Sequence, residues 1–185
     1  VNDAAGSTNF GLFTSDNFGA TFTQVPSVTV PVDYVAISSA SGQYQAALQT
    51  GTPSLYISSS YGGNDDPESQ PWEDKSGALP SGVYCDAVYV GPTGNYMYLS
   101  KCFMKTGAVP ISTESLYYSA DFGRTWENAQ APLVSWEHVT SDQYSGSNVF
   151  ASSVAGVYYS DNFGRPGSFK LIDSSSGWKY IVSDT

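Results

Sequence analysis

The sequence predicts an all-β protein, a small β-propeller of four four-stranded blades. Its composition disfavours helices, because Tyr, Ser, Gly, Val and Thr dominate while the good helix formers Lys, Arg, Glu and Leu are scarce. A short phrase recurs four times, and strand-like segments alternate with glycine turns between its copies. Short strands with regular turn signals indicate an all-β fold, and a four-stranded unit repeated at this period favours a propeller.

The repeated phrase runs from a serine to a glycine four residues later, with an aromatic residue directly before the glycine. Each copy follows a β-rich tripeptide, as Leu116–Tyr118 precedes the third copy. The copies begin at Ser15, Ser58, Ser119 and Ser160. The second copy carries an insertion over residues 63–71 before its tryptophan, and the fourth has one extra residue before Phe169.

The segments between the phrases read as pairs of strands. The expected first strands are Val32–Ser38, Tyr84–Val90, Trp136–Ser141 and Trp178–Ser183. The first three are followed by a turn that ends in Gly42, Gly94 or Gly146 and then by a second strand. With the strands before and after each phrase, every repeat holds four strands. We therefore expect one domain over residues 1–185, with repeats at 26–76, 77–130 and 131–172 and a fourth formed by 178–185 together with 1–25.

The two ends of the chain look like halves of one repeat. Trp178–Ser183 is a first strand without partner strands, whereas Val1–Ala5 aligns with a second strand that has no first strand. Because an unpaired edge invites aggregation, we expect Trp178–Ser183 to pair with the N-terminal repeat and close a ring of four sheets. The alternative is that this strand inserts into the N-terminal repeat of the next subunit, a heterologous contact that would build a filament.

The four phrases resemble the Asp box, or BNR repeat, with the pattern Ser-x-Asp-x-Gly-x-Thr-Trp. Families with Asp-box propellers include sialidases, sortilin-type receptors, some plant-polysaccharide hydrolases and a photosystem assembly factor. In these families the box lies at the blade periphery, away from the active face, so the resemblance implies a structural role. The third copy matches at every position and the others are degenerate. The positions concerned are Ser15, Asn17, Gly19, Ser58, Gly62, Ser119, Asp121, Gly123, Thr125, Trp126, Ser160, Asn162 and Gly164.

The chemistry of the box is that of a hairpin turn. An Asp or Asn side chain caps neighbouring backbone N–H groups, and glycine supplies a positive φ. The aromatic residue at the end of the box, such as Trp126, is expected to pack between sheets. The box thus identifies a fold and not a function.

The residue counts bear on two classes of enzyme. Sialidases bind the substrate carboxylate with three arginines, and this chain has two, Arg124 and Arg165, both within box turns. A glycosidase needs two opposed carboxylates. With seventeen acidic residues, the chain could supply such a pair, so the composition does not exclude this class. The expectation is a protein that is not an enzyme, with a glycan-active hydrolase that uses paired carboxylates as the alternative.

Metal and cofactor sites find little support in the sequence. The densest acidic cluster is Asp65, Asp66, Glu68, Glu73 and Asp74, in and beside the insertion. It reads as a solvated loop, with calcium binding at Asp65 and Asp66 as a minor alternative, since hard cations take carboxylate oxygens. His138 is the single histidine, which argues against zinc. No metal and no cofactor are therefore expected.

Binding or assembly is the function that the sequence favours, with a carbohydrate or a protein as ligand. Tyrosine and tryptophan stack on sugars and anchor protein interfaces. Of the 14 tyrosines, Tyr61 and Tyr144 are the loop residues expected to make exposed contacts. A net charge of −10 argues against nucleic acid and anionic lipid, and no apolar run is long enough for membrane insertion. The acidic, lysine-poor composition suggests an extracellular or cell-surface location.

A disulfide between Cys85 and Cys102 is predicted from the hairpin that turns through Pro92–Asn95. If Gly91 pairs with Tyr96, the two cysteines are opposed and Asp86 lies opposite Lys101. The same register sets Val88 and Val90 against Leu99 and Met97. Opposed cysteines have nearly the required separation, and the bond would imply an oxidising compartment. Two free buried thiols are the alternative.

Overall fold

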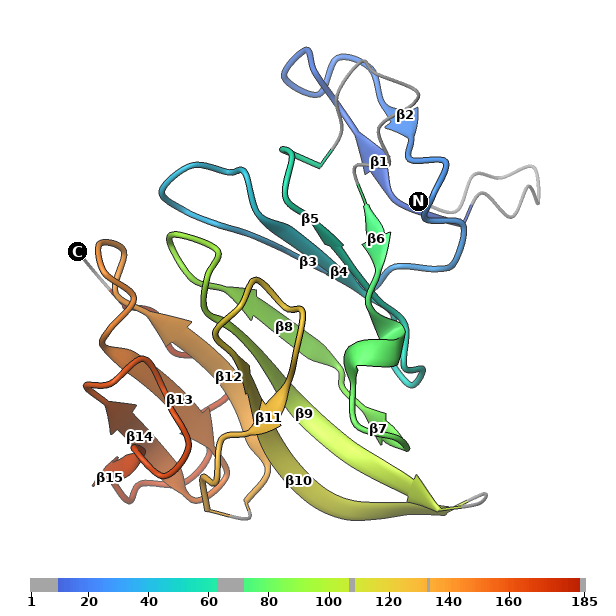
Figure 1. The fold of residues 1–185 in the computed structure, drawn as a ribbon. Coiled ribbons are helices and arrows are strands. Elements are labelled where there is room, and N and C mark those ends of the chain that lie inside the picture. The colour runs from blue at the N-terminus through green and yellow to red at the C-terminus, as the bar shows by residue number, and fades with distance from the viewer. Residues whose placement is uncertain (1–9, 63–71, 107–108, 133, 184–185) are drawn as a thin grey trace.

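Four antiparallel sheets follow one another along the chain (Figure 1). The computed structural model describes residues 10–62, 72–106, 109–132 and 134–183. Sheet 1 comprises β1 (Phe13–Thr14) and β2 (Thr23–Gln24); sheet 2 comprises β3 (Tyr34–Ile37), β4 (Gln45–Leu48), β5 (Leu55–Ser58) and β6 (Glu73–Asp74). Sheet 3 comprises β7 (Val83–Tyr84), β8 (Ala87–Val90), β9 (Met97–Thr106), β10 (Val109–Ser119) and β11 (Glu127–Asn128); sheet 4 comprises β12 (Trp136–Ser141), β13 (Val149–Ser153), β14 (Gly156–Ser160) and β15 (Lys170–Asp173).

The all-β prediction is confirmed. Within the described residues the helical structure is one 3₁₀ turn, η1 (Ser76–Ala78). In sheets 2 and 4 the spatial order of the four strands is their order along the chain, as repeated hairpins require. In sheet 3 the first strand of the repeat is split, so that β7 and β8 both pair with β9. Among the residues that the structure describes, the first strand of sheets 2, 3 and 4 has one edge that pairs with no other strand.

Apolar side chains fill three layers, one between each pair of successive sheets. Successive residues of a strand point to opposite faces, so β4 contributes Ala47 to the layer shared with sheet 1 and Leu48 to the layer shared with sheet 3. Tyr98 of β9 packs against sheet 4, in the same layer as Trp136. Sheets 2 and 3 are therefore covered on both faces, which fixes the order of the sheets.

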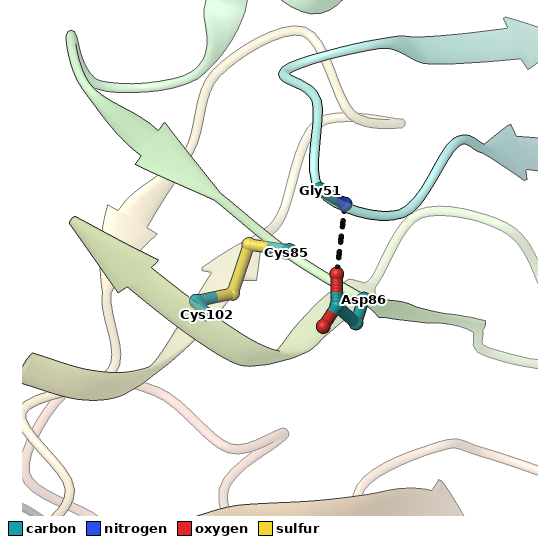
Figure 2. Close-up of a disulfide and its surroundings, with 4 residues drawn as sticks. All are labelled: Gly51, Cys85, Asp86 and Cys102. Carbon is teal, nitrogen blue, oxygen red and sulfur yellow. Dashed lines mark hydrogen bonds between the residues drawn. A yellow bond between two sulfur atoms is a disulfide. The ribbon is translucent and has the colours of Figure 1, made fainter. Parts of the chain in front are cut away.

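The structure contains the Cys85–Cys102 disulfide, which joins the segment between β7 and β8 to β9 (Figure 2). Next to it, charged groups of sheet 3 hold the β4–β5 turn of sheet 2. The Gly51 N–H donates to Asp86 Oδ1 (3.0 Å), as Figure 2 shows, and Lys105 Nζ donates to the Gly51 carbonyl (3.1 Å). The N–H and the carbonyl of Gly51 thus both form hydrogen bonds across the boundary between the sheets. Without these bonds, the two groups would be left without partners, which costs stability.

The β8–β9 hairpin has the predicted register. Val88 lies opposite Leu99, and Val90 lies opposite Met97. The same register sets Asp86 opposite Lys101, because the flanking pairs Tyr84–Phe103 and Ala87–Ser100 keep it, but the two side chains form no salt bridge within the described residues. Lys101 adopts a left-handed φ of 54°, which interrupts the regular ladder next to the disulfide. Its ammonium group pairs with Glu137 of β12 at 3.1 Å, whereas Asp86 accepts the hydrogen bond from Gly51.

The expected closure of the ring is not observed. Sheet 1 lies at one end of the row of sheets and sheet 4 at the other, with sheets 2 and 3 between them (Figure 1). Residues 178–183 form no strand. They lie along β12: Ser183 Oγ shares a hydrogen bond with Thr140 Oγ1 (3.2 Å), and the Tyr180 ring lies 5.7 Å from the ring of His138. Contacts with sheet 4 therefore position this segment, and they leave the described part of sheet 1 with two strands.

The β12–β13 hairpin is held by one carboxylate. Asp142 accepts hydrogen bonds from the backbone N–H groups of Tyr144, Ser145, Gly146 and Asn148. Burial alone would raise the pKa of Asp142, but these N–H donors, together with the Ser145 hydroxyl, lower it to about 2. The ionised form is therefore part of the folded hairpin.

Asp142→Asn should make the free energy of unfolding less sensitive to a fall in pH in the acid range. The pKa of Asp142 is lowered from 3.8 to about 2, so the folded state binds fewer protons than the unfolded chain in this range. The stabilisation is present at neutral pH and is lost as the pH falls from about 4 towards 2. We expect the wild type to exceed Asp142→Asn in stability at pH 7, with the difference shrinking below pH 4. Urea unfolding at several pH values measures this, with Asp161→Asn as an exposed control; a pH-independent difference would contradict it.

Candidate functional site

The third Asp box shows the full set of expected contacts. Asp121 Oδ1 accepts from the Ser119 hydroxyl and the Thr125 N–H, both at 2.9 Å, and Oδ2 accepts from the Thr125 hydroxyl at 2.6 Å. Burial tends to raise the pKa of Asp121, but these donors lower it below its usual value. Gly123 has a φ of 74°, and Trp126 donates its indole N–H to the Gly123 carbonyl (3.2 Å). The hydrogen-bond donors to this carboxylate therefore lie within its own turn.

The degenerate boxes keep parts of this pattern. In all four, the serine hydroxyl accepts from the glycine N–H, at 2.8 to 3.1 Å. Asn17 replaces the carboxylate in the first box by accepting from the Thr21 N–H at 2.8 Å. The terminal aromatics Trp72 and Trp126 are buried, as expected, but Phe22 of the first box is 64% exposed. Phe22 belongs to sheet 1, which is the end of the row, so no preceding sheet covers it within the described residues.

Asp121→Ala should destabilise the protein without changing ligand affinity. Loss of the cap leaves turn N–H groups without their acceptor and should lower the free energy of unfolding by about 1 kcal/mol. Thermal unfolding measures the change, and Asp16→Ala, an exposed position of the first box, is the control. A selective loss of binding with an unchanged melting temperature would show that the box has a direct role in recognition.

A cavity of about 340 Å³ lies where the first strands of sheets 2, 3 and 4 come together. It is lined by the whole of β3 and β8, together with Ser100, His138 and Val139, and we call it the axial cavity. Its walls are mostly aliphatic, with the aromatic side chains of Tyr34, Tyr89 and His138 among them. A mostly apolar recess with a few polar groups is the usual form of a ligand site, and this volume lies at the small end of the range for such sites.

The polar groups around the axial cavity are neutral or paired. Burial lowers the pKa of His138, against the opposing effect of a backbone hydrogen bond with Ile181, so the imidazole is neutral near pH 7. Its Nδ1 atom is buried and has no partner within the described part of the chain. The Tyr89 hydroxyl accepts from the Ser141 N–H at 3.1 Å. Lys101 and Glu137 neutralise each other nearby. The cavity therefore suits an uncharged ligand group.

The candidate ligand-binding and metal-binding residues predicted from the sequence do not line the axial cavity. Tyr61 and Tyr144 are 62% and 80% exposed, and neither lines the axial cavity. Asp65, Asp66 and Glu68 lie outside the described residues, whereas Glu73 and Asp74 form the exposed strand β6. No group of three or more metal-ligating side chains occurs among the residues that the structure describes.

Sequence reasoning missed the axial cavity because its lining comes from three separate repeats. The alternation of His138 with Trp136 along one strand predicts only a packed or edge residue. One signal was present: Tyr34 and His138 stand the same distance before the turn glycines Gly42 and Gly146. Equivalent places in a repeat face the same axis, so these two residues could have been assigned to one site.

The chain contains the BNR-Asp box repeat, because the family model for that repeat matches residues 12–25. Together with the row of antiparallel sheets, this repeat makes the chain similar to the Asp-box β-propellers. No curated protein sequence matches the chain. Within the described residues, no helix is long and apolar enough to cross a membrane.

Solved structures with the same fold are propellers of several kinds. A GH74 xyloglucanase from Xanthomonas campestris is 19% identical, with a TM-score of 0.60, over 88% of this chain and 27% of that one. YCF48 bound to D1 peptide is 11% identical, with a TM-score of 0.55, over 88% of this chain and 47% of that one. A nidogen/laminin complex gives 12% identity and a TM-score of 0.54, over 88% of this chain and 55% of the other. The chain spans from about a quarter to about half of these structures, and the likeness shows the fold alone.

Proposed function

We propose that the protein is a non-catalytic extracellular binding module that takes a carbohydrate or a protein segment into the axial cavity. The observation that carries this proposal is the cavity itself, which three sheets build from aliphatic walls, two tyrosines and His138. Tyrosine faces stack on sugar rings and on apolar peptide side chains alike.

The lining of the cavity supports binding over catalysis. Glycoside hydrolysis needs two carboxyl groups on opposite sides of the scissile bond. None of the residues that line the axial cavity is acidic. The nearby carboxylate of Glu137 is engaged by Lys101 at 3.1 Å. A bound sugar would therefore meet no acid and base in the cavity.

The structural neighbours support both kinds of ligand. Two of their names describe proteins with a peptide or protein partner, namely YCF48 with a D1 peptide and nidogen with laminin. Another is a xyloglucanase, which favours a glycan-active hydrolase as the second candidate function. For that candidate, the two carboxylates would have to lie outside the axial cavity.

The Cys85–Cys102 disulfide supports an extracellular or cell-surface location, since such bonds persist in oxidising compartments. The net charge of −10 disfavours binding to nucleic acid and to anionic membranes, because both are negatively charged. Assembly into a larger structure is the other part of the proposal, because the row of sheets leaves apolar side chains exposed at both ends, among them Phe22 and Val182.

Two screens on the wild-type chain test the proposal. A glycan array and a peptide array report binding, and a panel of polysaccharides, followed by analysis of released sugars, reports hydrolysis. We expect binding to at least one class of ligand and no release of reducing sugar. Hydrolysis of any polysaccharide would establish the second candidate in place of the first, and the absence of binding on both arrays would contradict the proposed ligand role.

A further inference from the structure

Strand β9 contains a bulge beside the axial cavity. Its pairing with β10 shifts by one residue between Leu99 and Cys102, so that Ser100 and Lys101 together occupy the place of one residue. Leu99 and Cys102 accordingly face the same apolar layer, between sheets 2 and 3, although residues three apart in a regular strand face opposite sides. A β-bulge redirects the side chains at the point where it lies. Ser100, in this bulge, lines the cavity.

Lys101 forms the bulge with a backbone conformation that residues with a side chain seldom adopt. Its φ is 54°, in the left-handed region. Five other non-glycine residues have a positive φ in the described part of the chain. Four of them precede the glycine of an Asp box, and the fifth, Gln130, lies between β11 and β12, so Lys101 is the one within a strand. Strained conformations of this kind cluster at functional sites, where the surrounding contacts maintain them.

The redirected side chain of Lys101 joins sheet 3 to sheet 4. In a regular strand Lys101, two residues after Leu99, would face the layer between sheets 2 and 3. Instead, its ammonium group lies 3.1 Å from Glu137 Oε2 on β12. Burial disfavours the charged form of Lys101, but the contact with Glu137 raises the pKa of the ammonium group above its usual value. The ion pair is therefore intact at neutral pH.

The ion pair lies directly beside the axial cavity. Ser100, which precedes Lys101, and His138, which follows Glu137, both line the cavity. Lys101 and Glu137 are not themselves among the lining residues. The pair therefore acts on the cavity through the two strands that carry it.

Strand β12 is attached to sheet 3 at both of its ends. At its last residue, the Ser141 N–H donates to the Tyr89 hydroxyl of β8 at 3.1 Å. Near its first residue, the Lys101–Glu137 pair makes the second attachment. His138–Val139, which are the lining residues of sheet 4, lie between the two. The two attachments therefore hold this wall of the cavity against β8.

The contribution of the ion pair to folding does not account for the strained conformation. The side chains of Lys101 and Glu137 are 37% and 24% exposed, and ion pairs with this access to solvent add little to stability. The left-handed φ is itself unfavourable for a residue with a Cβ atom. A benefit is therefore expected at the site that the pair borders.

We propose that Lys101 is a positioning residue for the axial cavity. Through its ion pair with Glu137, it holds the sheet 4 wall at the separation from β8 that the bound ligand requires. Its conformation is retained for binding and not for folding. This inference rests on the proposed ligand role of the axial cavity.

Lys101→Gly separates binding from folding, because it removes the ammonium group and the backbone strain together. Glycine adopts a positive φ without a steric penalty, so the urea midpoint should stay close to that of the wild type or rise. The affinity should fall by about two- to thirtyfold, as for changes that act on a site through neighbouring residues. Calorimetric titration with the tightest-binding member of the glycan and peptide arrays measures this. Lys101→Arg keeps a cation that can pair with Glu137 and should keep the affinity.

A double-mutant cycle tests the ion pair itself. Lys101→Gln, Glu137→Gln and the double variant all remove the same pair, so each single change should weaken binding about as much as the double change does. Gln130→Gly is the control for a change of backbone at a left-handed residue. Lys75→Gln is the control for loss of an ion pair elsewhere, since Lys75 pairs with Glu73 in sheet 2. Both controls should bind as the wild type does.

Wild-type affinity in Lys101→Gly and in the double variant would overturn the positioning role and leave the axial cavity as the binding site. A clearly lower urea midpoint for Lys101→Gly would also overturn it, because Lys101 would then serve the fold. Equal losses of affinity in Lys101→Arg and Lys101→Gly would contradict a role of the ion pair. If no member of the arrays binds the wild type, the proposed function fails, and this inference fails with it.

Discussion

Trp126→Ala should lower the free energy of unfolding by about 3–5 kcal/mol, the cost of removing a large buried aromatic side chain. Trp126 is the aromatic residue of the one complete Asp box and is 8% exposed, in the layer that also holds Ile57 of sheet 2 and Met97 of sheet 3. Its indole N–H also donates to the Gly123 carbonyl. The substitution therefore removes packing between two sheets together with a hydrogen bond that orients the turn.

Phe22→Ala provides the matched control, because Phe22 holds the same position in the first box and is 64% exposed. We expect it to change the stability of the monomer by less than about 0.5 kcal/mol, as is usual for surface substitutions. Urea unfolding of the two variants at low protein concentration measures the difference. Equal costs for the two would mean that burial between sheets does not determine the role of the box aromatic.

Removal of the Cys85–Cys102 disulfide should have the second large effect. The bond closes a chain segment of 17 residues, for which the loss of the constraint on the unfolded state is worth about 3 kcal/mol. The doubly substituted Cys85→Ser, Cys102→Ser variant should therefore unfold at clearly lower urea concentration. Both cysteines are buried, so alkylation is carried out on wild-type protein unfolded in urea without reductant, and the disulfide should leave its intact mass unchanged.

The doubly substituted variant also serves as the control for any effect of the reductant other than reduction of the disulfide. Reduction should destabilise the wild type by about as much as the double substitution does, and should leave the variant unaffected. Alkylation of two thiols in protein that was never reduced would show that the bond does not form, and would remove the support that it gives to an extracellular location.

Local sequence signals predicted the parts of the fold that short-range chemistry decides. The turn glycines Gly42, Gly94 and Gly146 all have positive φ values, and each ends a hairpin between strands as expected. The β8–β9 register followed from the opposed apolar pairs and the hairpin turn. These features depend on residues close in sequence, whose turn geometry and alternation determine the pairing.

Features that depend on distant residues were not predictable in the same way. The strand-like composition of Trp178–Ser183 indicated a strand but could not say where it would lie, and contacts of Tyr180 and Ser183 hold it beside β12. The left-handed φ of Lys101 and its salt bridge with Glu137, a residue of the next sheet, are not indicated by the local sequence pattern. The axial cavity requires the first strands of three repeats to converge, which is a property of the whole arrangement of sheets.

Calorimetric titration of site variants tests the central claim, binding in the axial cavity, most directly. The ligand is the strongest hit from the glycan and peptide arrays, titrated into the wild type, Tyr34→Ala, His138→Ala and Tyr144→Ala. Because Tyr34 and His138 line the cavity and Tyr144 does not, the first two substitutions should weaken binding by about tenfold or more, and the third should leave it unchanged. Loss of binding in Tyr144→Ala alone, with wild-type affinity in the two cavity variants, would contradict the account.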